Sequence, residues 1–506
     1  MELLANLALG LDVALSPSAL LYCFIGVTLG TLVGVLPGIG PMAAISLALP
    51  ITYHLDPTNA LIMLAGIFYG TQYGGSTASI LLNLPGSITS AVTCLDGYPM
   101  AQSGRAGVAL FITAIASFLG SSFAILVVVG FSTTVAEAAL GFSSFEYFSI
   151  MLLGLIAAST LSQGSALKGL SMVVFGTVLG LIGTDTTTGQ FRFTFDSVVL
   201  SDGISLVALA MGLFGVAEIV SNILRPASSQ GPLKVKLREM LPERDDWRRF
   251  WKPATRGSLL GTAIGILPGT GATLASFLSY SLEKKVASDP SRFGNGAVEG
   301  ITAPEAANNA ATQSGFIPTL SLGIPGDAIM ALLLGAMMIH GIVPGPTFIT
   351  EHSGMFWGLI MSFWVGNLLL LVLNIPLIGV WVKLLSIPYH ILYPCILVLI
   401  CIGVYSAQNS TFDVLVALVF GLIGYVMQQY KYPAAPLLLG FVLGPLVEEH
   451  LRRAMLLSNG SFAEFFLRPL SAVFLIGTLL LLLLAMRPWL TRVLGRRQVR
   501  DASGAA

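Results

Sequence analysis

Charge is scarce in this sequence. Only 10% of the 506 residues are Asp, Glu, Lys or Arg, whereas a soluble globular domain carries about 25%. The 25 basic residues balance the 25 acidic ones, so the formal net charge is zero. Without a basic excess, or a basic patch interleaved with aromatic residues, nothing in the sequence indicates binding to nucleic acid.

Cysteine, histidine and the motifs of common enzymes are scarce as well. The four cysteines and five histidines are scattered without metal-ligand spacing, which predicts no metal centre of that kind and no other bound cofactor. The patterns GxxxxGK[ST], HExxH and GxSxG do not occur. The sequence therefore encodes no P-loop, zinc-protease helix or nucleophile elbow, and we do not expect an enzyme.

Apolar residues are abundant instead. They make up 55% of the chain, and the mean hydropathy is +0.85. Apolar runs of about 20 residues, the length that crosses a bilayer as a helix, recur along the chain. We predict an all-α polytopic membrane protein with about ten to twelve transmembrane helices. The expected crossings are 18–36, 107–130, 146–160, 168–183, 203–223, 257–268, 328–343, 355–379, 391–405, 412–428, 433–446 and 470–486, with shorter apolar pieces at 42–53 and 58–69.

Basic residues are unevenly placed along the chain. Segment 225–256 carries nine Lys and Arg against four acidic residues, and five more arginines follow from Arg487 onward. By the positive-inside rule both segments face the cytoplasm. No basic residue precedes Arg105, so we expect the N-terminus on the outer, periplasmic side and the C-terminus in the cytoplasm.

The N-terminal segment lacks the basic start of a cleaved signal peptide, so we expect an interfacial helix there. The predicted organisation follows from this segment, the two repeat halves and the two basic segments. Its parts are an interfacial segment 1–17, a first repeat half 18–223, a basic cytoplasmic linker 224–256, a second repeat half 257–446, and a C-terminal helix with a basic tail 447–506.

Two motifs recur in the same order. "GTLVGVLPGIG" at 30–40 matches "GTAIGILPGTG" at 261–271 at seven of eleven positions, and "YGGSTASILLNLPG" at 73–86 aligns with "QSGFIPTLSLGIPG" at 313–326. The second half holds nine extra residues between its breaks, which we expect within 283–304. Because the two copies stand in opposite charge contexts, they predict inverted-topology repeats with broken helices and two re-entrant hairpins. A chance match of small-residue motifs is the alternative.

The Pro-Gly breaks are candidate binding sites. Proline and glycine interrupt a helix and free backbone groups, which in a membrane must face protein or a wet cavity. Freed N–H groups suit a carboxylate, and freed carbonyls suit Na⁺. A simple packing kink is the alternative. The predicted substrate-binding residues at the breaks are Pro37, Gly38, Gly40, Gly86, Pro268, Gly269, Gly271 and Gly326. Sodium is expected near Gly38, Gly86, Gly269, Gly326 and Asp327.

Polar side chains fill the stretches between the breaks. Hydroxyl and amide groups can hold an anion or coordinate a cation without carrying charge into the membrane. Interhelical hydrogen bonding is the alternative role. The residues predicted to contact substrate are Thr71, Ser76, Thr77 and Asn83 in the first half, and Asn309, Thr312 and Ser314 in the second.

Few ionisable residues lie near the apolar segments. They are Asp96, Arg105, Glu137, Lys168, Glu305, Asp327, His340 and Lys383. An ionisable residue inside a membrane is a functional candidate, although the basic ones fall near predicted helix ends, where snorkelling explains them. Asp327 directly follows the second Pro-Gly, which makes it a cation ligand or a helix N-cap, and the cap is the favoured role.

Together these motifs resemble a known family. "GVLPGIGP", "FYGTQYGGSTASILLNLPG", "DGYPMAQSG", "GILPGTGATLASFLSY", "TLSLGIPGD" and "MMIHGIVPGP" resemble the large membrane subunit of the tripartite tricarboxylate transporters, the TctA family, over residues 20–445. The resemblance implies a periplasmic solute-binding protein and a small membrane subunit of four helices as partners. It also implies uptake of citrate or another carboxylate, driven by an ion gradient across the bacterial inner membrane.

The predicted function is therefore a secondary importer of an organic carboxylate, a symporter coupled to Na⁺ or H⁺. The paired breaks suggest an elevator motion, in which both hairpins move as one domain past a scaffold of the remaining helices. An uncoupled gated channel is the first alternative. An intramembrane enzyme is the second, and the sequence shows no nucleophile or metal cluster for it.

Overall fold

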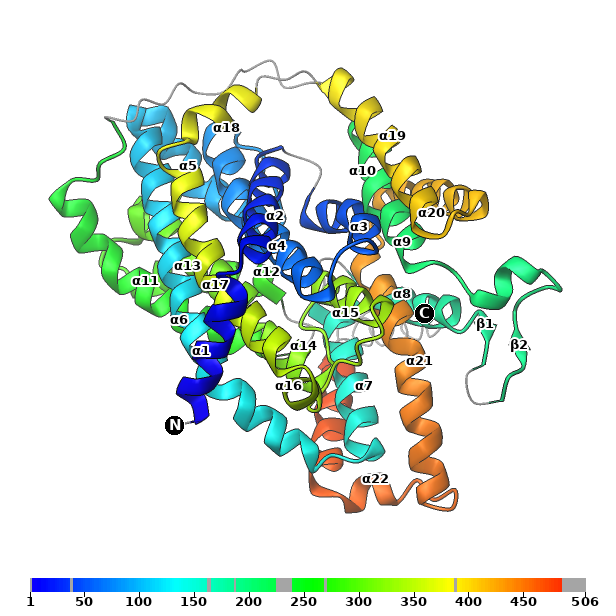
Figure 1. Cartoon of the computed structure of the whole chain (residues 1–506). Helices are drawn as coiled ribbons and strands as arrows, with labels where there is room; N and C mark the ends of the chain where they lie inside the picture. The colour runs from blue at the N-terminus through cyan, green and yellow to red at the C-terminus, as the bar shows by residue number, and fades with distance from the viewer. Residues whose placement is uncertain are drawn as a thin grey trace, which may run out of the picture. The chain divides into compact units, whose positions relative to one another are not determined.

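The computed structural model is helical almost throughout (Figure 1), as the sequence predicts. It describes residues 2–36, 40–161, 165–185, 188–223, 239–267, 271–385 and 389–484. Within these residues the one sheet is a pair of two-residue strands, β1 (Gly183–Thr184) and β2 (Phe191–Arg192). The prediction of an all-α polytopic fold is confirmed.

The chain packs as two compact units. The first contains residues 1–141 and 204–428, and the second contains 142–203 and 429–506. These units are defined by packing, whereas the predicted parts 18–223 and 257–446 are defined by sequence repetition, so the predicted division stays a prediction. The repeated motifs of both halves, 30–86 and 261–326, lie within the first unit.

The elements of the first unit follow in chain order. They are α1 (Glu2–Ala14), α2 (Pro17–Val35), α3 (Gly40–Thr52), α4 (Pro57–Leu82), η1 (Thr89–Ala91), α5 (Thr93–Met100), η2 (Ala101–Arg105), α6 (Ala106–Leu140), α9 (Leu206–Ala210), η4 (Met211–Val216), α10 (Ala217–Ile223), α11 (Arg244–Gly265), α12 (Gly271–Val286), η6 (Pro290–Arg292), α13 (Val298–Ser314), α14 (Phe316–Leu322), α15 (Ala328–Ile339), α16 (Phe348–Glu351), α17 (Ser353–Asn374), α18 (Ile378–Leu384), α19 (Tyr389–Gln408) and α20 (Thr411–Gln429).

The second unit is smaller. Besides β1 and β2 it contains α7 (Ser144–Leu161), α8 (Ala166–Gly180), η3 (Val198–Asp202), α21 (Ala434–Leu457), α22 (Glu464–Leu467) and an apolar helix Pro469–Leu484. Close packing of α8 on α21 is possible because glycines lie between them. A Cβ added at Gly176 would lie 1.9 Å from the carbonyl oxygen of Leu437.

A charged cluster lies at the end of the strand hairpin in this second unit. Asp185 accepts hydrogen bonds from Arg192 and Arg452, and Arg192 also donates to Glu448 at 2.8 Å. The hydrogen bonds that Arg192 donates to Glu448 and Asp185 raise the pKa of its guanidinium. These residues line a cavity of about 370 Å³, so the charges satisfy one another at its wall.

Five helical segments among the described residues are long and apolar enough to cross a membrane. They are Pro17–Val35, Thr93–Leu140, Ser353–Asn374, Thr411–Gln429 and Ala434–Leu457. The second of these bends at Gly104, whose φ of 85° interrupts the helical backbone between α5 and α6. Glycine tolerates this left-handed conformation, which costs other residues energy.

Local sequence explains where the first-half helices begin. Pro17 and Pro57 open α2 and α4, since the first helical position needs no N–H donor. The side chains of Ser16 and Asp56 cap these starts by accepting backbone hydrogen bonds.

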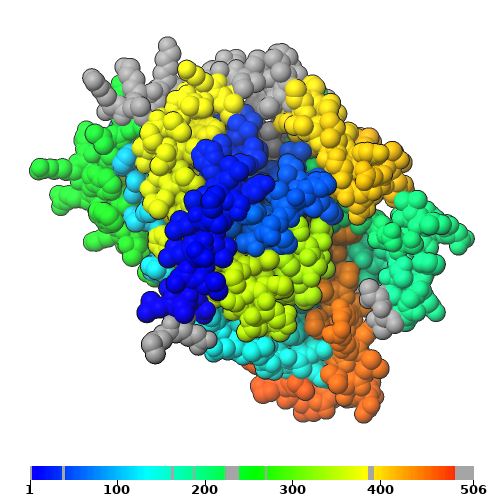
Figure 2. All heavy atoms as spheres, viewed as in Figure 1, coloured from blue at the N-terminus to red at the C-terminus, as the bar shows by residue number. Residues whose placement is uncertain are grey.

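In Figure 2 α1, in dark blue, lies on the surface beside α17, in yellow. The two helices approach closely there, since a Cβ added at Gly10 would lie 2.5 Å from the carbonyl oxygen of Trp357.

Candidate functional site

Three glycines of α2 face α4. Gly26, Gly30 and Gly34 recur every fourth residue, so they share one helix face. A Cβ added at any of them would lie 2.4–2.5 Å from a backbone oxygen of α4. Only glycine therefore allows the two helices to approach this closely. The oxygens belong to Met63, Ile67 and Thr71.

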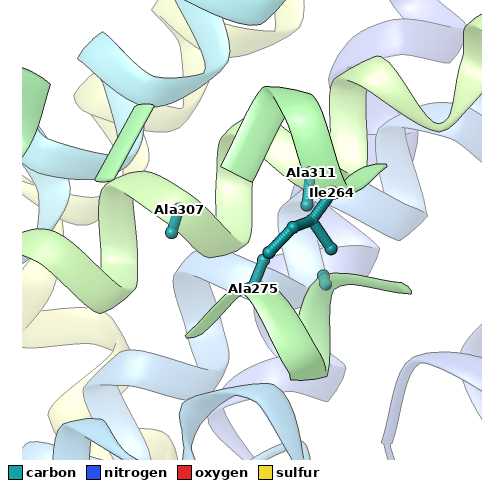
Figure 3. Packing of buried hydrophobic residues seen from close by; sticks show 5 residues of the cluster. Ile264, Ala275, Ala307 and Ala311 are labelled. Carbon is teal, nitrogen blue, oxygen red and sulfur yellow. The ribbon is translucent and has the colours of Figure 1, made fainter. Parts of the chain in front are cut away.

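The second half repeats this stripe. Gly257, Gly261 and Gly265 of α11 lie against α13, and a Cβ at any of them would lie 2.2–2.4 Å from a backbone oxygen. The oxygens belong to Ala303, Ala307 and Ala311. Figure 3 shows the small side chains that make this possible, with Ile264 of α11 beside Ala311 of α13 and Ala275 of α12.

The two stripes correspond residue by residue. Gly30 matches Gly261 in the sequence repeat, and their partners Ile67 and Ala307 hold corresponding places in α4 and α13. The same correspondence holds one turn earlier and one turn later. The extra residues of the second half therefore fall between α12 and α13, around η6, in agreement with the expected range 283–304.

The first break of each half ends one helix and starts another. α2 ends at Val35 and α3 begins at Gly40 with φ +66°, while α11 ends at Gly265 and α12 begins at Gly271 with φ +60°. The matched glycines thus adopt the same left-handed conformation, which favours glycine. The predicted site residues Pro37, Gly38, Pro268 and Gly269 lie outside the described residues.

The second break of each half also has one geometry. Asn83 follows α4 with φ 56°, and Gly323 follows α14 with φ 69°. Each left-handed residue is followed by a hydrophobic residue, proline and then Gly86 or Gly326. Asn83 is exposed, whereas Gly86 and Gly326 are buried.

Within each half the second break returns to the end of the first broken helix. A Cβ at Gly86 would lie 2.1 Å from the Gly34 oxygen and 2.7 Å from the Cα of Gly75. A Cβ added at the corresponding Gly326 would have more room, with the Cα of Gly315 at 3.5 Å and the Gly265 oxygen at 3.6 Å as its nearest atoms. The structure therefore brings two breaks together in each half.

The two halves also meet at these breaks. η1, which follows the second break of the first half, packs against α12, which begins after the first break of the second half. In the same way α15 packs against α3. The Thr89 hydroxyl at the end of the first-half break donates to Oε1 of Gln72 at 2.8 Å.

Several predicted contact residues donate hydrogen bonds within their own helices. The hydroxyls of Thr71, Ser76 and Thr312 donate to backbone oxygens three or four residues earlier, at 2.6, 3.2 and 2.9 Å. Thr77 is buried in the same helix as Thr71. The Ser314 hydroxyl would lie 2.2 Å from a Cβ added at Gly265, so it packs against the end of α11 at the first break. These hydroxyls keep lone pairs for a ligand.

Buried amide groups remain without partners in this region. Both amide atoms of Asn308 and Gln313, Nε2 of Gln72 and Oδ1 of Asn309 have none within the described structure. All four side chains are at most 1% exposed. Buried polar atoms are normally hydrogen-bonded, so these amides on α4 and α13 are candidate ligand contacts.

Asp327 caps α15. Its Oδ1 accepts the N–H of Met330 at 2.9 Å, and its side chain lies 3.3 Å from where a Cβ of Gly271 would be. The prediction of a helix N-cap is confirmed. The sodium predicted near Gly86, Gly326 and Asp327 stays a prediction.

Glu305 was named among the ionisable candidates but not among the residues predicted to contact substrate. Glu305 of α13 is 1% exposed, and its carboxylate accepts hydrogen bonds from Thr93 and, at 3.3 Å, from Ser117. Asn309 donates to Ser117 Oγ at 2.8 Å. An acid inside an apolar chain marks Glu305 in the sequence, but its partners are over 180 residues away and carry no local signal.

Another long-range contact holds α4 to α17. The Tyr73 hydroxyl donates to Oδ1 of Asn367 at 2.6 Å, and Asn367 Nδ2 donates to the Phe118 oxygen at 3.2 Å. Both residues are buried. Neither was predicted, because tyrosine and asparagine in membrane helices mostly serve interhelical hydrogen bonding.

Comparison with known proteins identifies relatives of this chain. A 49% identical relative from Agrobacterium vitis, described as an uncharacterised 52.8 kDa protein in the TAR-I ttuC′ 3′ region, covers 96% of this chain and 97% of its own length. A second Agrobacterium vitis protein, from the TAR-II ttuC′ 3′ region, is 53% identical over 45% of this chain and 94% of its own.

A more distant relative from Methanocaldococcus jannaschii is 24% identical over 53% of this chain and 62% of its own length. No solved structure matches the chain. The model of the tripartite tricarboxylate transporter TctA family matches residues 20–439, so the chain belongs to this family.

Proposed function

We propose that the chain is the translocation subunit of a tripartite system that imports a tricarboxylate, such as citrate, or a related organic carboxylate by secondary transport. Family membership supports a membrane transporter of this class. The observation that carries the proposal is the meeting of two helix breaks in each half, Gly34 with Gly86 and Gly265 with Gly326. Broken helices at a repeat interface are the usual substrate site of secondary transporters.

The substrate carboxylates would contact backbone N–H groups at the breaks and the polar side chains beside them. Gly40 and Gly271 begin helices, where N–H groups lack partners and carry partial positive charge. The unpartnered amides of Asn308 and Gln313 add neutral donors and acceptors. The coupling cation, Na⁺ or H⁺, would bind in the same region.

The proposed motion is an elevator. Residues 30–87 and 261–327, which contain both hairpins, would move together past the remaining helices. Packing of α4 in the first range against α13 in the second supports movement as one body. Inward- and outward-facing structures should show a rigid-body shift of these two ranges. Structures that differ only in side-chain gates would contradict the elevator.

The proposed partners are a periplasmic solute-binding protein, which delivers the substrate, and a small membrane subunit of four helices. The family belongs to tripartite transporters, which supports both. The proposed location is the bacterial inner membrane, with the N-terminus in the periplasm and the C-terminus in the cytoplasm. The basic segment 225–256 supports that orientation.

Reconstitution tests the proposal. The full chain, its small subunit and its binding protein would be placed in proteoliposomes and given citrate under an imposed Na⁺ or proton gradient. We expect accumulation above the external concentration, lost when the gradient is dissipated. Equilibration that ignores every imposed gradient would indicate a gated channel instead.

A pair of variants locates the site within that assay. Gly326→Leu introduces a bulky side chain at the paired breaks, and we expect it to abolish uptake while the protein still inserts in the membrane. Gly354→Leu is the matched control, since a Cβ there meets open space. Normal uptake by Gly326→Leu would overturn the site assignment.

A further inference from the structure

The Glu305 carboxylate lies deep in the first unit without a counter-charge. It is 1% exposed, and it forms no ion pair among the described residues. An ionised carboxylate away from water is costly unless a positive charge or a proton neutralises it. Hydrogen bonds from neutral hydroxyls reduce that cost but leave the charge in place.

Oxygen-bearing side chains from four helices surround this carboxylate. Thr93 of α5 and Ser117 of α6 donate to its two oxygens, and the Ser76 hydroxyl of α4 faces it. Asn309, one turn along α13, donates to Ser117 and keeps its Oδ1 without a partner. Hydroxyl, amide and carboxylate oxygens are the ligands of hard cations.

The other titratable groups around Glu305 do not supply the missing charge. Tyr73 of α4 and Cys94 of α5 face it and are neutral. α6 presents Ser117, and α14 has no titratable residue. Asp96 of α5 accepts hydrogen bonds from Tyr280 and Gly294. Arg256 of α11 pairs with Glu283 of α12, and Glu299 of α13 pairs with Arg249 and Arg292. The other basic residues of α11 and α12 are exposed, whereas Glu305 is buried; they are Arg244, Arg248, Lys252, Lys284 and Lys285.

We infer that Glu305, with Thr93, Ser117 and Asn309, is the site that binds the coupling monovalent cation, a proton or Na⁺. The inference rests on the proposed function, which requires such a cation. Binding converts the carboxylate and one cation into a neutral site, and release on the other side restores the carboxylate. No covalent bond other than O–H forms or breaks.

The position also couples the two halves. Glu305 and Asn309 belong to the second half, whereas Ser76, Thr93 and Ser117 belong to the first. Neutralising the carboxylate changes the strength of hydrogen bonds that cross between the halves, because bonds to a charged acceptor are stronger. Cation occupancy therefore alters how firmly α13 is held to α5 and α6.

Direct cation binding to the purified full-length chain tests the inference without any substrate. Melting is compared in NaCl and in choline chloride at equal ionic strength, since a ligand of the folded state raises its stability. Infrared difference spectra across a pH series detect a buried carboxyl group that gains a proton. We expect the wild type to show a sodium-specific rise in Tm or a titrating carboxylic-acid band.

Glu305→Gln should lose whichever signal the wild type shows, since the neutral amide neither takes up a proton nor supplies a negative charge for Na⁺. Glu299→Gln is the matched control, because Glu299 lies on the same helix but pairs with arginines, and it should keep the signal. A Glu305→Gln variant that keeps the wild-type signal overturns the inference. So does a wild type that shows neither signal.

Ser117→Ala provides the second variant, which retains the carboxylate if Glu305→Gln does not fold. If the cation is Na⁺, loss of an oxygen ligand should raise its half-saturating concentration about tenfold. If the cation is a proton, the ionised form loses a donor, so the acid band should persist to higher pH. An unchanged response in both measurements overturns the inference. Failure of citrate uptake, in contrast, would contradict the proposed function and leave cation binding unaffected.

Discussion

The two repeat halves share one backbone design but differ in how tightly it is filled. In the first half glycines occupy both sides of the helix contact, with Gly66, Gly70 and Gly74 of α4 facing the glycines of α2. At the corresponding positions α13 has Ala306, Ala310 and Ser314. The first half is therefore packed backbone against backbone, whereas the second leaves room for small side chains.

The difference extends to the chemistry. The position of Glu305 is Ala65 in the first half, and that of Asn309 is Tyr69. The second break is clamped in the first half, where Gly86 has no room for a Cβ, and looser in the second, where Gly326 has ordinary contacts. Repetition thus preserves the helix breaks and the glycine stripe, while the buried acid and the unpartnered amides of Asn308 and Gln313 are specific to the second half.

The largest expected difference is between alanine substitutions at the two second breaks. Gly86→Ala places a Cβ 2.1 Å from the backbone oxygen of Gly34, which cannot move independently. We expect a loss of about 3 kcal/mol in the free energy of unfolding. Gly326→Ala meets atoms no nearer than 3.5 Å, so its effect should be below about 1 kcal/mol.

Thermal or denaturant unfolding of the purified variants measures both values. Equal losses for the two substitutions would show that the looser packing of the second break is not real.

The glycine stripe should be sensitive in both halves. Gly30→Ala and Gly261→Ala each drive a Cβ to 2.4 and 2.2 Å from a backbone oxygen, and each should cost about 2 kcal/mol. Gly66→Ala has its nearest atoms at 3.1–3.3 Å and creates the residue found at Ala306. It should cost about 1 kcal/mol or less.

The same unfolding assay applies to this set. A neutral Gly261→Ala would contradict the correspondence between the two stripes.

The smallest expected effect concerns the cap at Asp327. Asp327→Ala removes the acceptor for the Met330 N–H and should cost about 1 kcal/mol. Asp327→Asn keeps an acceptor, so its free energy of unfolding should stay within about 0.5 kcal/mol of wild type. Uptake assays on Asp327→Asn separate the cap from a cation ligand. Preserved gradient dependence supports the cap alone, and lost gradient dependence would assign Asp327 to the cation site.

Much of the fold was predictable because its signals are local. The length of the apolar runs predicts the helices, and the recurring Pro-Gly pairs mark both breaks of each half. Asp327 as an N-cap followed from its place directly after a Pro-Gly, and the structure confirms it. Helices such as α3 and α15 are shorter than a full crossing because each begins at a break.

The polar pairings were not predictable from one sequence. Glu305 stands out as an acid in an apolar chain, but nothing near it indicates that Thr93 and Ser117 will be its partners. The Tyr73–Asn367 hydrogen bond joins residues almost 300 positions apart. Such pairs depend on how the helices pack, which periodicity does not specify.

We propose that the two repeat halves cross the membrane in opposite directions. Single cysteines at Ser18, at the start of α2, and at Arg244, at the start of α11, test it in a chain whose four native cysteines are replaced. Both positions are exposed. A membrane-impermeant maleimide added to intact cells should label Ser18→Cys from the periplasm and leave Arg244→Cys unlabelled until the inner membrane is permeabilised. Labelling of both cysteines from the same side would contradict the inverted repeat.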